Sequence, residues 1–359
     1  MNNNSKNLNP LALNATVCVL SARRYGDAIM NASILKQAAQ VRPDIDWVIW
    51  TKPEFVPLFQ LMGFNHLITA EFPIAGGFPK FIKGGWISLV KSIWKLRRLK
   101  IDASIDFIGD VRESFLGMLI GSKRHYSPKW SPSHWMHHLI WRAPIPGVNY
   151  ILVQSDNSQV YQFTPKLLSN LMGAKITAQI SSNSKQLVFD APPKIAFHPY
   201  SSQTFKQWPA QNWMELAKLL SPYVLSTKIL CSPTEEKMAQ EQFGACKPLI
   251  NITSCDSLDK LIAEIQEIDL LIGVDSFLVH LASALGKKTI VLNAGNLPQW
   301  WAPLHSLAIG QSGGCPNYPC FNEPKCIGKP NESACIKSIA PAQVMNGIRF
   351  HTATQMSSQ

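Results

Sequence analysis

The sequence predicts two doubly wound α/β domains, because short apolar strands alternate with helical segments in both halves of the chain. The length of 359 residues fits two domains, and a polar segment over residues 174–193 separates them. We expect a flexible N-terminus over residues 1–14, one α/β domain over 15–180 and a second over 190–340. A C-terminal helix is expected over 341–350, where it can cross back to the first domain.

The first half begins with an apolar segment over residues 15–20, which predicts a buried strand. A helical segment follows over 29–39, and a second apolar strand over 47–50 ends before Pro53. A strand, a helix and a strand in this order form a βαβ unit of a parallel sheet, and residues 102–108 predict a later strand of that sheet.

The second half repeats this alternation. Strands are expected over 194–198, 228–231, 249–252, 269–273 and 289–292, the last closing the series, and helices over 213–220, 235–243, 258–267 and 278–285. Such open sheets bind ligands beside the carboxyl ends of their strands, so the polar residues at those ends are the candidate site.

Composition narrows the classes of function. Apolar residues make up 46% and charged residues 16% of the chain, which excludes a disordered protein. The net charge of +11 favours an anionic partner: a nucleic acid, an anionic membrane or a phosphorylated substrate. No apolar run reaches the roughly 18 residues that span a bilayer, and the N-terminus lacks the pattern of a signal peptide, so we expect a cytoplasmic protein, soluble or peripherally bound.

The first candidate site follows the strand over 269–273. Asp275 and Ser276 lie at its carboxyl end, and Ser276 is a good N-cap for the helix that carries His280. The free N–H groups of a helix N-terminus suit a phosphate. The alternative is that Asp275 and Ser276 only cap the helix and that His280 is a core residue.

The second candidate site follows the strand over 194–198. Ser201 and Ser202 offer hydroxyl and N–H groups there, and Lys206 offers a mobile positive charge that suits a phosphate. The alternative is an ordinary surface loop, in which Lys206 has no ligand.

The third candidate site follows the first strand, where Gly26 permits a tight turn and Asp27 stands near the start of a helix. Asp27 is either an N-cap or a general base at the edge of a cleft. Arg23 and Arg24, next to it, are suited to lower its pKa or to bind an anion.

Taken together and in this order, these motifs resemble glycosyltransferase family 9, the bacterial lipopolysaccharide heptosyltransferases, over residues 15–348. The matching segments are Tyr25-Gly26-Asp27, Ser201-Ser202, Lys206-Gln207-Trp208-Pro209 with Trp213, Gly273-Val274-Asp275-Ser276 with His280, Trp301-Ala302-Pro303, and Ile339-Ala340-Pro341 with Val344. The resemblance implies a GT-B-like fold, two Rossmann-like domains facing a central cleft, with the acceptor bound by the first and the donor by the second.

The resemblance also implies the reaction: inverting transfer of a heptose from ADP-heptose to the lipopolysaccharide core, at the inner membrane and without a metal or other cofactor. Asp27 would be the general base. The donor would be bound by Ser201, Ser202, Lys206, Glu235, Asp275, Ser276 and His280, with Glu235 preferred over Glu236 as the residue that meets the ribose. The acceptor would meet the basic residues Arg23, Arg24, Arg97, Arg112, Lys123 and Arg124.

Two departures from the family pattern keep another donor open. Phe277 stands where the family has a glycine that lets the backbone approach the diphosphate, and Ser232 replaces a second glycine. A glycosyltransferase of the same fold with a different nucleotide sugar is therefore the alternative. A basic nucleic-acid-binding protein is a distant one, since no nucleic-acid motif is present.

Three further features stand outside these motifs. Cys315, Cys320, Cys326 and Cys335 lack the tight C-x2-C pairs of zinc sites, so reduced structural cysteines are favoured and a metal stays open. His134, His137 and His138 lack the glutamate of a metalloprotease motif, which favours a partner-facing or core-edge cluster.

The third feature is a basic amphipathic helix over residues 85–98. Its apolar face is expected to contain Trp86, Leu89, Val90, Ile93 and Trp94. This helix either packs on the sheet or lies on an anionic membrane, and the basic stretch over 80–124 suits an anionic acceptor at the inner leaflet.

Overall fold

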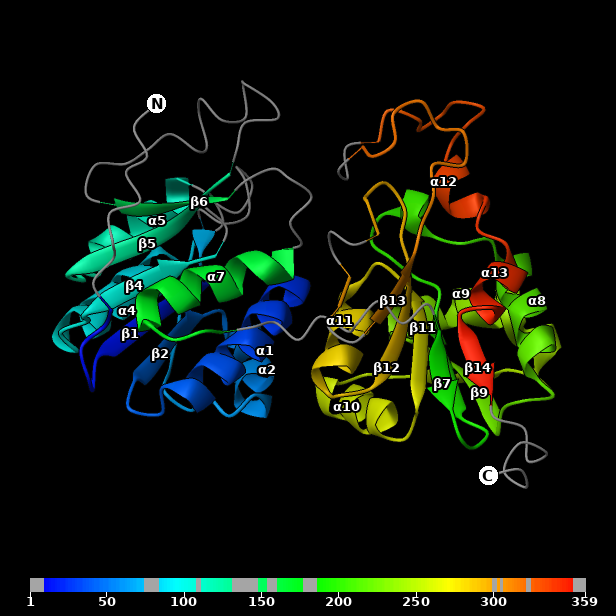
Figure 1. Cartoon of the computed structure of the whole chain (residues 1–359), viewed down its shortest axis with the longest axis horizontal. Coiled ribbons are helices and arrows are strands. Elements are labelled where there is room, and N and C mark those ends of the chain that lie inside the picture. Colours follow the sequence, from blue (N-terminus) through cyan, green and yellow to red (C-terminus); the bar gives the residue numbers. More distant parts are fainter. Residues whose placement is uncertain are drawn as a thin grey trace. The chain divides into compact units, whose positions relative to one another are not determined.

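The computed structural model forms two compact units, Met1–Ala178 and Gln179–Gln359, and the division falls inside the polar segment 174–193 (Figure 1). The structure describes residues 10–73, 84–107, 111–130, 148–153, 160–176, 186–298, 302–303, 306–320 and 324–350.

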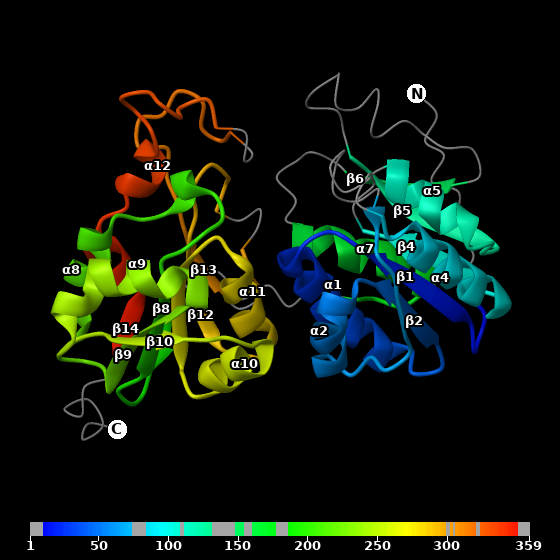
Figure 2. The same cartoon turned by 180° about the vertical axis from the view of Figure 1, so that it is seen from behind.

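The first unit is built on a six-stranded parallel sheet in the order β3-β2-β1-β4-β5-β6. Its strands are β1 (Thr16–Ser21), β2 (Asp46–Thr51), β3 (Leu67–Thr69), β4 (Ala103–Asp106), β5 (Arg124–Trp130) and β6 (Val148–Val153). Its longer helices are α1 (Tyr25–Val41), α2 (Val56–Leu61), α4 (Trp86–Arg98), α5 (Val111–Leu119) and α7 (Val160–Met172). Helices cover both faces of this sheet, which explains why β1 and β2 are buried at every position after the first (Figures 1 and 2).

The second unit repeats the plan with a sheet in the order β10-β9-β8-β11-β12-β13. Its strands are β8 (Lys194–His198), β9 (Ser226–Cys231), β10 (Asn251–Ser254), β11 (Leu270–Val274), β12 (Lys288–Leu292) and β13 (Ser306–Ile309). Its main helices are α8 (Ala210–Leu220), α9 (Pro233–Phe243), α10 (Leu258–Gln266) and α11 (Phe277–Ala284).

The sequence predicts that the strand over 289–292 is the last of the sheet, but the structure has one more strand after β12. The short β13 adds a parallel edge strand with the register Thr289↔Ser306 to Leu292↔Ile309. Its first three residues are only half-buried, as fits a strand at the edge of the sheet.

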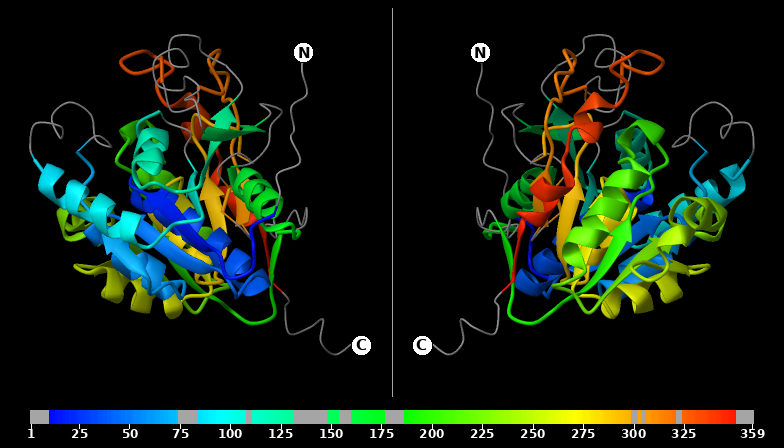
Figure 3. Two further views of the ribbon diagram at one scale, coloured as in Figure 1. Left: turned by 90° about the vertical axis from the view of Figure 1, so that its left-hand side faces the viewer. Right: turned by 90° about the vertical axis from the view of Figure 1, so that its right-hand side faces the viewer.

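The C-terminal segment, red in Figures 1 and 3, packs within the second unit. The helix α13 (Pro341–Met345) packs against α8, and β14 (Ile348–Phe350) pairs in parallel with β7 (Leu187–Phe189). The helix is therefore shorter than the expected 341–350, and the elements that this segment contacts, α8 and β7, belong to the second unit. A buried hydrogen bond from Trp208 Nε1 to the carbonyl of Ile339 (2.9 Å) holds the approach to α13.

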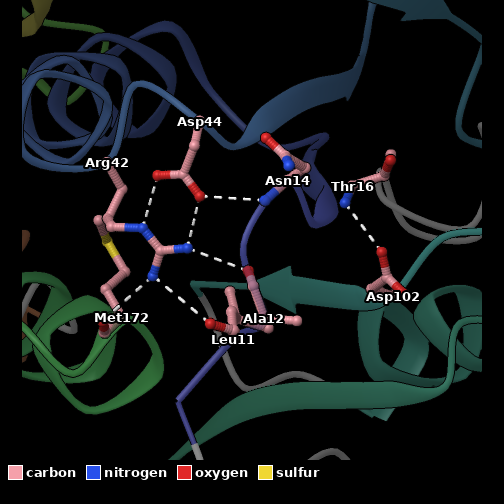
Figure 4. A network of polar contacts seen from close by, with 8 residues as sticks. All are labelled: Leu11, Ala12, Asn14, Thr16, Arg42, Asp44, Asp102 and Met172. Atoms are coloured by element: carbon pink, nitrogen blue, oxygen red, sulfur yellow. Dashed lines mark hydrogen bonds and ion pairs between the residues drawn. The ribbon is translucent and has the colours of Figure 1, made fainter.

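A fork of hydrogen bonds fastens the start of the described chain to the first unit (Figure 4). The guanidinium of Arg42 pairs with the Asp44 carboxylate at 2.6 and 2.7 Å and donates to the carbonyls of Ala12 (3.0 Å) and Met172 (3.3 Å). The same carboxylate accepts from the N–H of Asn14 (3.1 Å). One arginine thus joins the N-terminal segment, the end of α1 and the end of α7.

Candidate functional site

The candidate site of the second unit lies at the carboxyl edge of its sheet, between β8 and β11. These two strands are hydrogen-bonded neighbours, with His198 opposite Gly273. The chain runs outward from β8 to β9 and β10 and then returns to β11, so the strand order reverses at this point. Open α/β sheets bind ligands at such a switch point, beside the carboxyl ends of the strands.

Three polar side chains meet at this edge. Lys206, in a 3-10 turn over Thr204–Lys206, donates from Nζ to Oδ2 of Asp275 at 2.7 Å, and both side chains are at most 10% exposed. The Nε2 atom of His280 lies 3.8 Å from the other carboxylate oxygen of Asp275. The loop after β8 and the first turn of α11 are thereby joined through one carboxylate.

The charge of this carboxylate follows from its neighbours. Burial alone would raise the pKa of Asp275, but the contact with His280 and the charge of Lys206 outweigh burial and lower the pKa to about 2. Asp275 is therefore ionised at neutral pH. Lys206 is buried and paired, so it is not the idle surface lysine of the alternative interpretation.

Ser276 occupies the N-cap position of α11, but its side chain makes no capping hydrogen bond. The hydroxyl oxygen is buried and has no hydrogen-bond partner within the described part of the chain. An unpaired buried hydroxyl is costly, so an oxygen-bearing ligand at this helix end would satisfy it. Phe277, the residue in place of the family glycine, is the first residue of α11 and is half-buried.

The two serines after β8 differ in their surroundings. The hydroxyl of Ser201 accepts from the N–H of Gln203 (3.3 Å), whereas Ser202 is exposed. Trp208 and Trp213 are buried beside this loop, with an edge-to-face contact of 5.0 Å between their rings. The packing of these two rings holds the loop that carries Lys206 against α8.

Of the two glutamates at the start of α9, Glu235 is half-buried and Glu236 is exposed. Oε2 of Glu235 accepts from the N–H (2.9 Å) and the hydroxyl (2.8 Å) of Ser232, forming a capping box. Ser232, where the family has glycine, thus caps α9. Glu235 also lies close enough to His198 to oppose the lowering of its pKa, which burial causes in the first place.

In the first unit, Asp27 lies in the first turn of α1, at the carboxyl edge of β1. Arg24 holds the N-cap position, so Asp27 is not the N-cap, and its side chain is half-buried. Arg23 forms an ion pair with Glu113, which is buried at the start of α5, and Lys52 donates to the carbonyl of Arg23 at 3.0 Å.

Sequence reasoning missed Glu113 and Lys52 at this edge. Both stand just beyond the carboxyl ends of strands adjoining β1, and that position was the available signal.

The six basic residues predicted to meet the acceptor do not form one group. Arg23, Arg24 and Arg112 follow the carboxyl ends of β1 and β4. The other three, Arg97, Lys123 and Arg124, lie at the opposite edge, where the strands begin. Lys123 is paired there with Asp102 at 2.6 Å. For the four residues within the basic stretch 80–124, the sequence could not separate Arg112 from Arg97, Lys123 and Arg124, because charge alone does not show at which edge of the sheet a residue lies.

The cysteines near the C-terminus are close together and reduced. Cys315, Cys320, Cys326 and Cys335 are free thiols that line one cavity of about 10 Å³. Across the described residues, no three His, Cys, Asp or Glu side chains are arranged to hold a metal ion. His134, His137 and His138 lie outside the described residues.

Hydropathy gives one further finding. None of the helices in the described ranges combines the length and the apolar character needed to cross a bilayer.

Comparisons with known proteins agree with this picture. The model of glycosyltransferase family 9 (heptosyltransferase) matches residues 89–330. Among curated protein sequences, none matches the chain.

Solved structures similar to the chain include proteins of E. coli and Veillonella parvula. Heptosyltransferase WaaC of E. coli with ADP is 17% identical, with 81% of this chain and 92% of that one covered and a TM-score of 0.62. A family 9 glycosyltransferase of Veillonella parvula is 17% identical (93% and 95% covered, TM-score 0.65). The E. coli ADP-heptose lipopolysaccharide heptosyltransferase II is 16% identical (92% and 97% covered, TM-score 0.63). At these identities the likeness shows the fold, which is of the GT-B type.

Proposed function

Since the chain belongs to glycosyltransferase family 9 and is a glycosyltransferase, we propose that it transfers a heptose from ADP-heptose to the lipopolysaccharide core. Among the similar structures, WaaC of E. coli was solved with ADP, and another is an ADP-heptose lipopolysaccharide heptosyltransferase, which supports this choice of donor. The proposal divides the work between the units: the second binds the donor and the first binds the acceptor.

The buried cluster of Lys206, Asp275 and His280 carries the donor half of the proposal. The diphosphate binds to the ammonium of Lys206, the hydroxyl of Ser276 and the free N–H groups at the start of α11. Asp275 does not touch the phosphates, because two anions repel each other. It is a positioning residue that fixes Lys206 and His280.

The remaining donor contacts come from the neighbouring loops. Ser201 and Ser202 add hydroxyl and N–H groups on the diphosphate side. Both capping bonds of Glu235 end at Oε2, and we assign Oε1 to a hydroxyl of the ribose.

In the reaction, the acceptor hydroxyl attacks the anomeric carbon of the heptose from the face opposite ADP. The bond from that carbon to the diphosphate oxygen breaks, and ADP leaves with the electron pair. Asp27 takes the proton of the attacking hydroxyl. His280 and Lys206 stabilise the charge on the departing diphosphate, a task for which other enzymes use a metal ion.

The acceptor is anionic and is anchored in lipid, so we propose that the enzyme works at the inner membrane as a peripheral protein. Arg23, Arg24 and Arg112 share the carboxyl edge of the sheet with Asp27 and are assigned to the acceptor's phosphate and carboxylate groups. The positive net charge of the chain supports an anionic acceptor and surface.

The test is the thermal stability of the full chain with a panel of nucleotide sugars, followed by transfer assays with the stabilising donor. We expect ADP-heptose and ADP to raise the melting temperature most, because a ligand stabilises the state that it binds. Lys206→Met should abolish this shift, and Lys218→Met, on the exposed face of α8, should retain it. If another nucleotide sugar stabilises the protein better, the alternative of a different donor applies.

A further inference from the structure

The helix α4 exposes an apolar stripe on the first unit. The sequence suggested one apolar face, but the structure divides those residues between two. Leu89, Ser92 and Leu96 are buried. On the outer side, Ile87 is 74%, Val90 62% and Trp94 55% exposed. Large apolar side chains at three successive contact positions of one helix are unusual on a surface without a partner.

Basic residues surround this stripe. Residues 84–100 contain five lysines and arginines and no acidic residue. Lys91 and Lys95 lie on the solvent side of α4, and the guanidinium of Arg98 stacks on the ring of Trp94, 3.1 Å from its centroid. Apolar side chains flanked by long cationic ones characterise helices that lie in the interface of an anionic bilayer.

The stripe extends toward the proposed acceptor edge. A helix that links two parallel strands runs back from their carboxyl edge to their amino edge, so the N-terminal end of α4 lies toward the edge that carries Asp27. The adjacent helix α5 contributes Leu116 to the same buried cluster as α4. Its outer side adds Phe115, which is 52% exposed.

From this arrangement, and on the basis of the proposed function, we propose that the outer face of α4 is the surface that docks on an anionic lipid bilayer. Ile87, Val90 and Trp94 enter the boundary between headgroups and acyl chains, and Lys91 and Lys95 contact the anionic headgroups. A bilayer fits better than an acidic protein surface, because the basic residues border apolar side chains that a lipid interface buries directly. A lipid-anchored acceptor is thereby held beside the edge that binds its sugars.

The experiment is co-sedimentation of the full chain with phosphatidylcholine vesicles, with and without phosphatidylglycerol. We expect binding only to the anionic vesicles, and weaker binding as salt is raised. The triple variant Ile87→Ser/Val90→Ser/Trp94→Ser and the charge variant Lys91→Glu/Lys95→Glu should each lower partitioning by about tenfold or more.

Matched controls replace equally exposed residues of the second unit. Leu225→Ser/Ile327→Ser and Lys218→Glu/Lys247→Glu should bind as the unaltered protein does. Transfer to an acceptor sugar stripped of its acyl chains should be the same for the triple variant and the unaltered chain, which also shows that the variant is folded.

The proposal is overturned if the unaltered chain does not bind anionic vesicles, or if the α4 variants bind as well as the controls. It is also overturned if the triple variant only converts a dimer to a monomer in sedimentation velocity and keeps its vesicle binding. Failure of the unaltered chain to use the stripped acceptor would count against the proposed reaction instead, since vesicle binding does not depend on that reaction.

Discussion

The ionised carboxylate of Asp275 links the stability of the protein in acid to the buried contacts of Asp275 with Lys206 and His280. Its pKa is about 2 in the folded chain and about 3.9 when unfolded, so the folded state gains stability when the group is ionised. That gain is complete above pH 4 and is lost as the pH falls toward 2. The unfolding free energy of the unaltered chain, relative to Asp275→Asn, should therefore fall by about 2 kcal/mol over this range.

This prediction is checked by urea unfolding at several pH values, with tryptophan fluorescence as the signal. Asp256→Asn, which alters an exposed carboxylate, is the control for general effects of acid. A pH-independent difference between the unaltered chain and Asp275→Asn would mean that the cluster does not hold the carboxylate ionised.

For Asp27 we predict a loss of rate without a loss of donor affinity. Asp27→Asn removes the proton acceptor but keeps the size of the side chain, so turnover should fall by roughly 100- to 10,000-fold. ADP affinity, measured by calorimetry, should be unchanged, because the donor residues belong to the other unit. Asp46→Asn at the start of β2 is the control. Near-normal turnover of the Asp27 variant would remove Asp27 from the mechanism.

At the residue scale, the sequence predicted that Lys206, Asp275 and His280 lie near one another, but not how they contact one another. Strand ends and helix starts put Lys206, Asp275 and His280 at one sheet edge, which is a consequence of parallel topology. The sequence could not show that Asp275 neutralises Lys206, because that contact joins residues 69 positions apart. For the same reason the Arg23–Glu113 pair, 90 positions apart, was invisible.

At the scale of one element, α5 depends on Gly117. This glycine faces the buried ring of His125, which is fixed by Ser104 Oγ at 2.7 Å and by Asp106 Oδ2 at 3.1 Å. A methyl group at Gly117 would overlap the ring. Gly117→Ala gains about 1 kcal/mol of helix propensity but overpacks the core.

Because the ring is held at both nitrogens, the clash should prevail over the propensity. We expect a net loss of about 1–3 kcal/mol in the unfolding free energy, measured by urea denaturation. Gly244→Ala is the matched control, since the nearest atom to its new methyl group is 3.6 Å away. A Gly117 variant as stable as that control would show that α5 shifts freely.

Another prediction at this scale concerns the hydrogen bonds that Arg42 donates at the end of α1. Arg42→Met removes the donors that hold the carbonyls of Ala12 and Met172. The N–H of Leu11, which donates to Leu171 at 2.8 Å, should then exchange with solvent at least about tenfold faster. Hydrogen exchange read by mass spectrometry measures this, with Lys36→Met on the exposed side of α1 as the control. Equal protection in both variants would show that the fork does not fasten the segment.

Among the elements, continuous apolar strands were the most predictable. The segment 194–198 coincides with β8, and β1, β2 and β12 differ from their predictions by one residue at one or both ends. Helices such as α1 begin earlier than predicted, because polar residues like Arg24 and Asp27 carry no apolar periodicity. The end of α13 and the short β14 depend on tertiary pairing with β7, which local sequence does not encode.

For the whole molecule, alternation of strands and helices was sufficient to predict two α/β units, whereas the GT-B class was expected only from the resemblance of the motifs to family 9. Each unit has a six-stranded parallel sheet, and its strand order reverses beside the first strand. The order of the motifs along the chain indicated the family, and the family model matches residues 89–330, which include the loops after β8 and β11. The segment after β12 was misjudged because its contacts with α8 and β7 are long-range.

The last prediction tests the independence of the second unit. Residues 179–359 contain a complete sheet, a hydrophobic core of their own and every residue assigned to the donor. Expressed alone, this segment should unfold cooperatively and bind ADP within about tenfold of the full chain's affinity, a difference of about 1.4 kcal/mol or less. It should transfer no sugar, because Asp27 is absent. Thermal unfolding by circular dichroism and calorimetric titration with ADP provide the measurements, and Lys206→Met in the same segment is the control for specific binding. A folded segment that binds ADP a hundredfold more weakly would mean that the first unit supplies essential donor contacts.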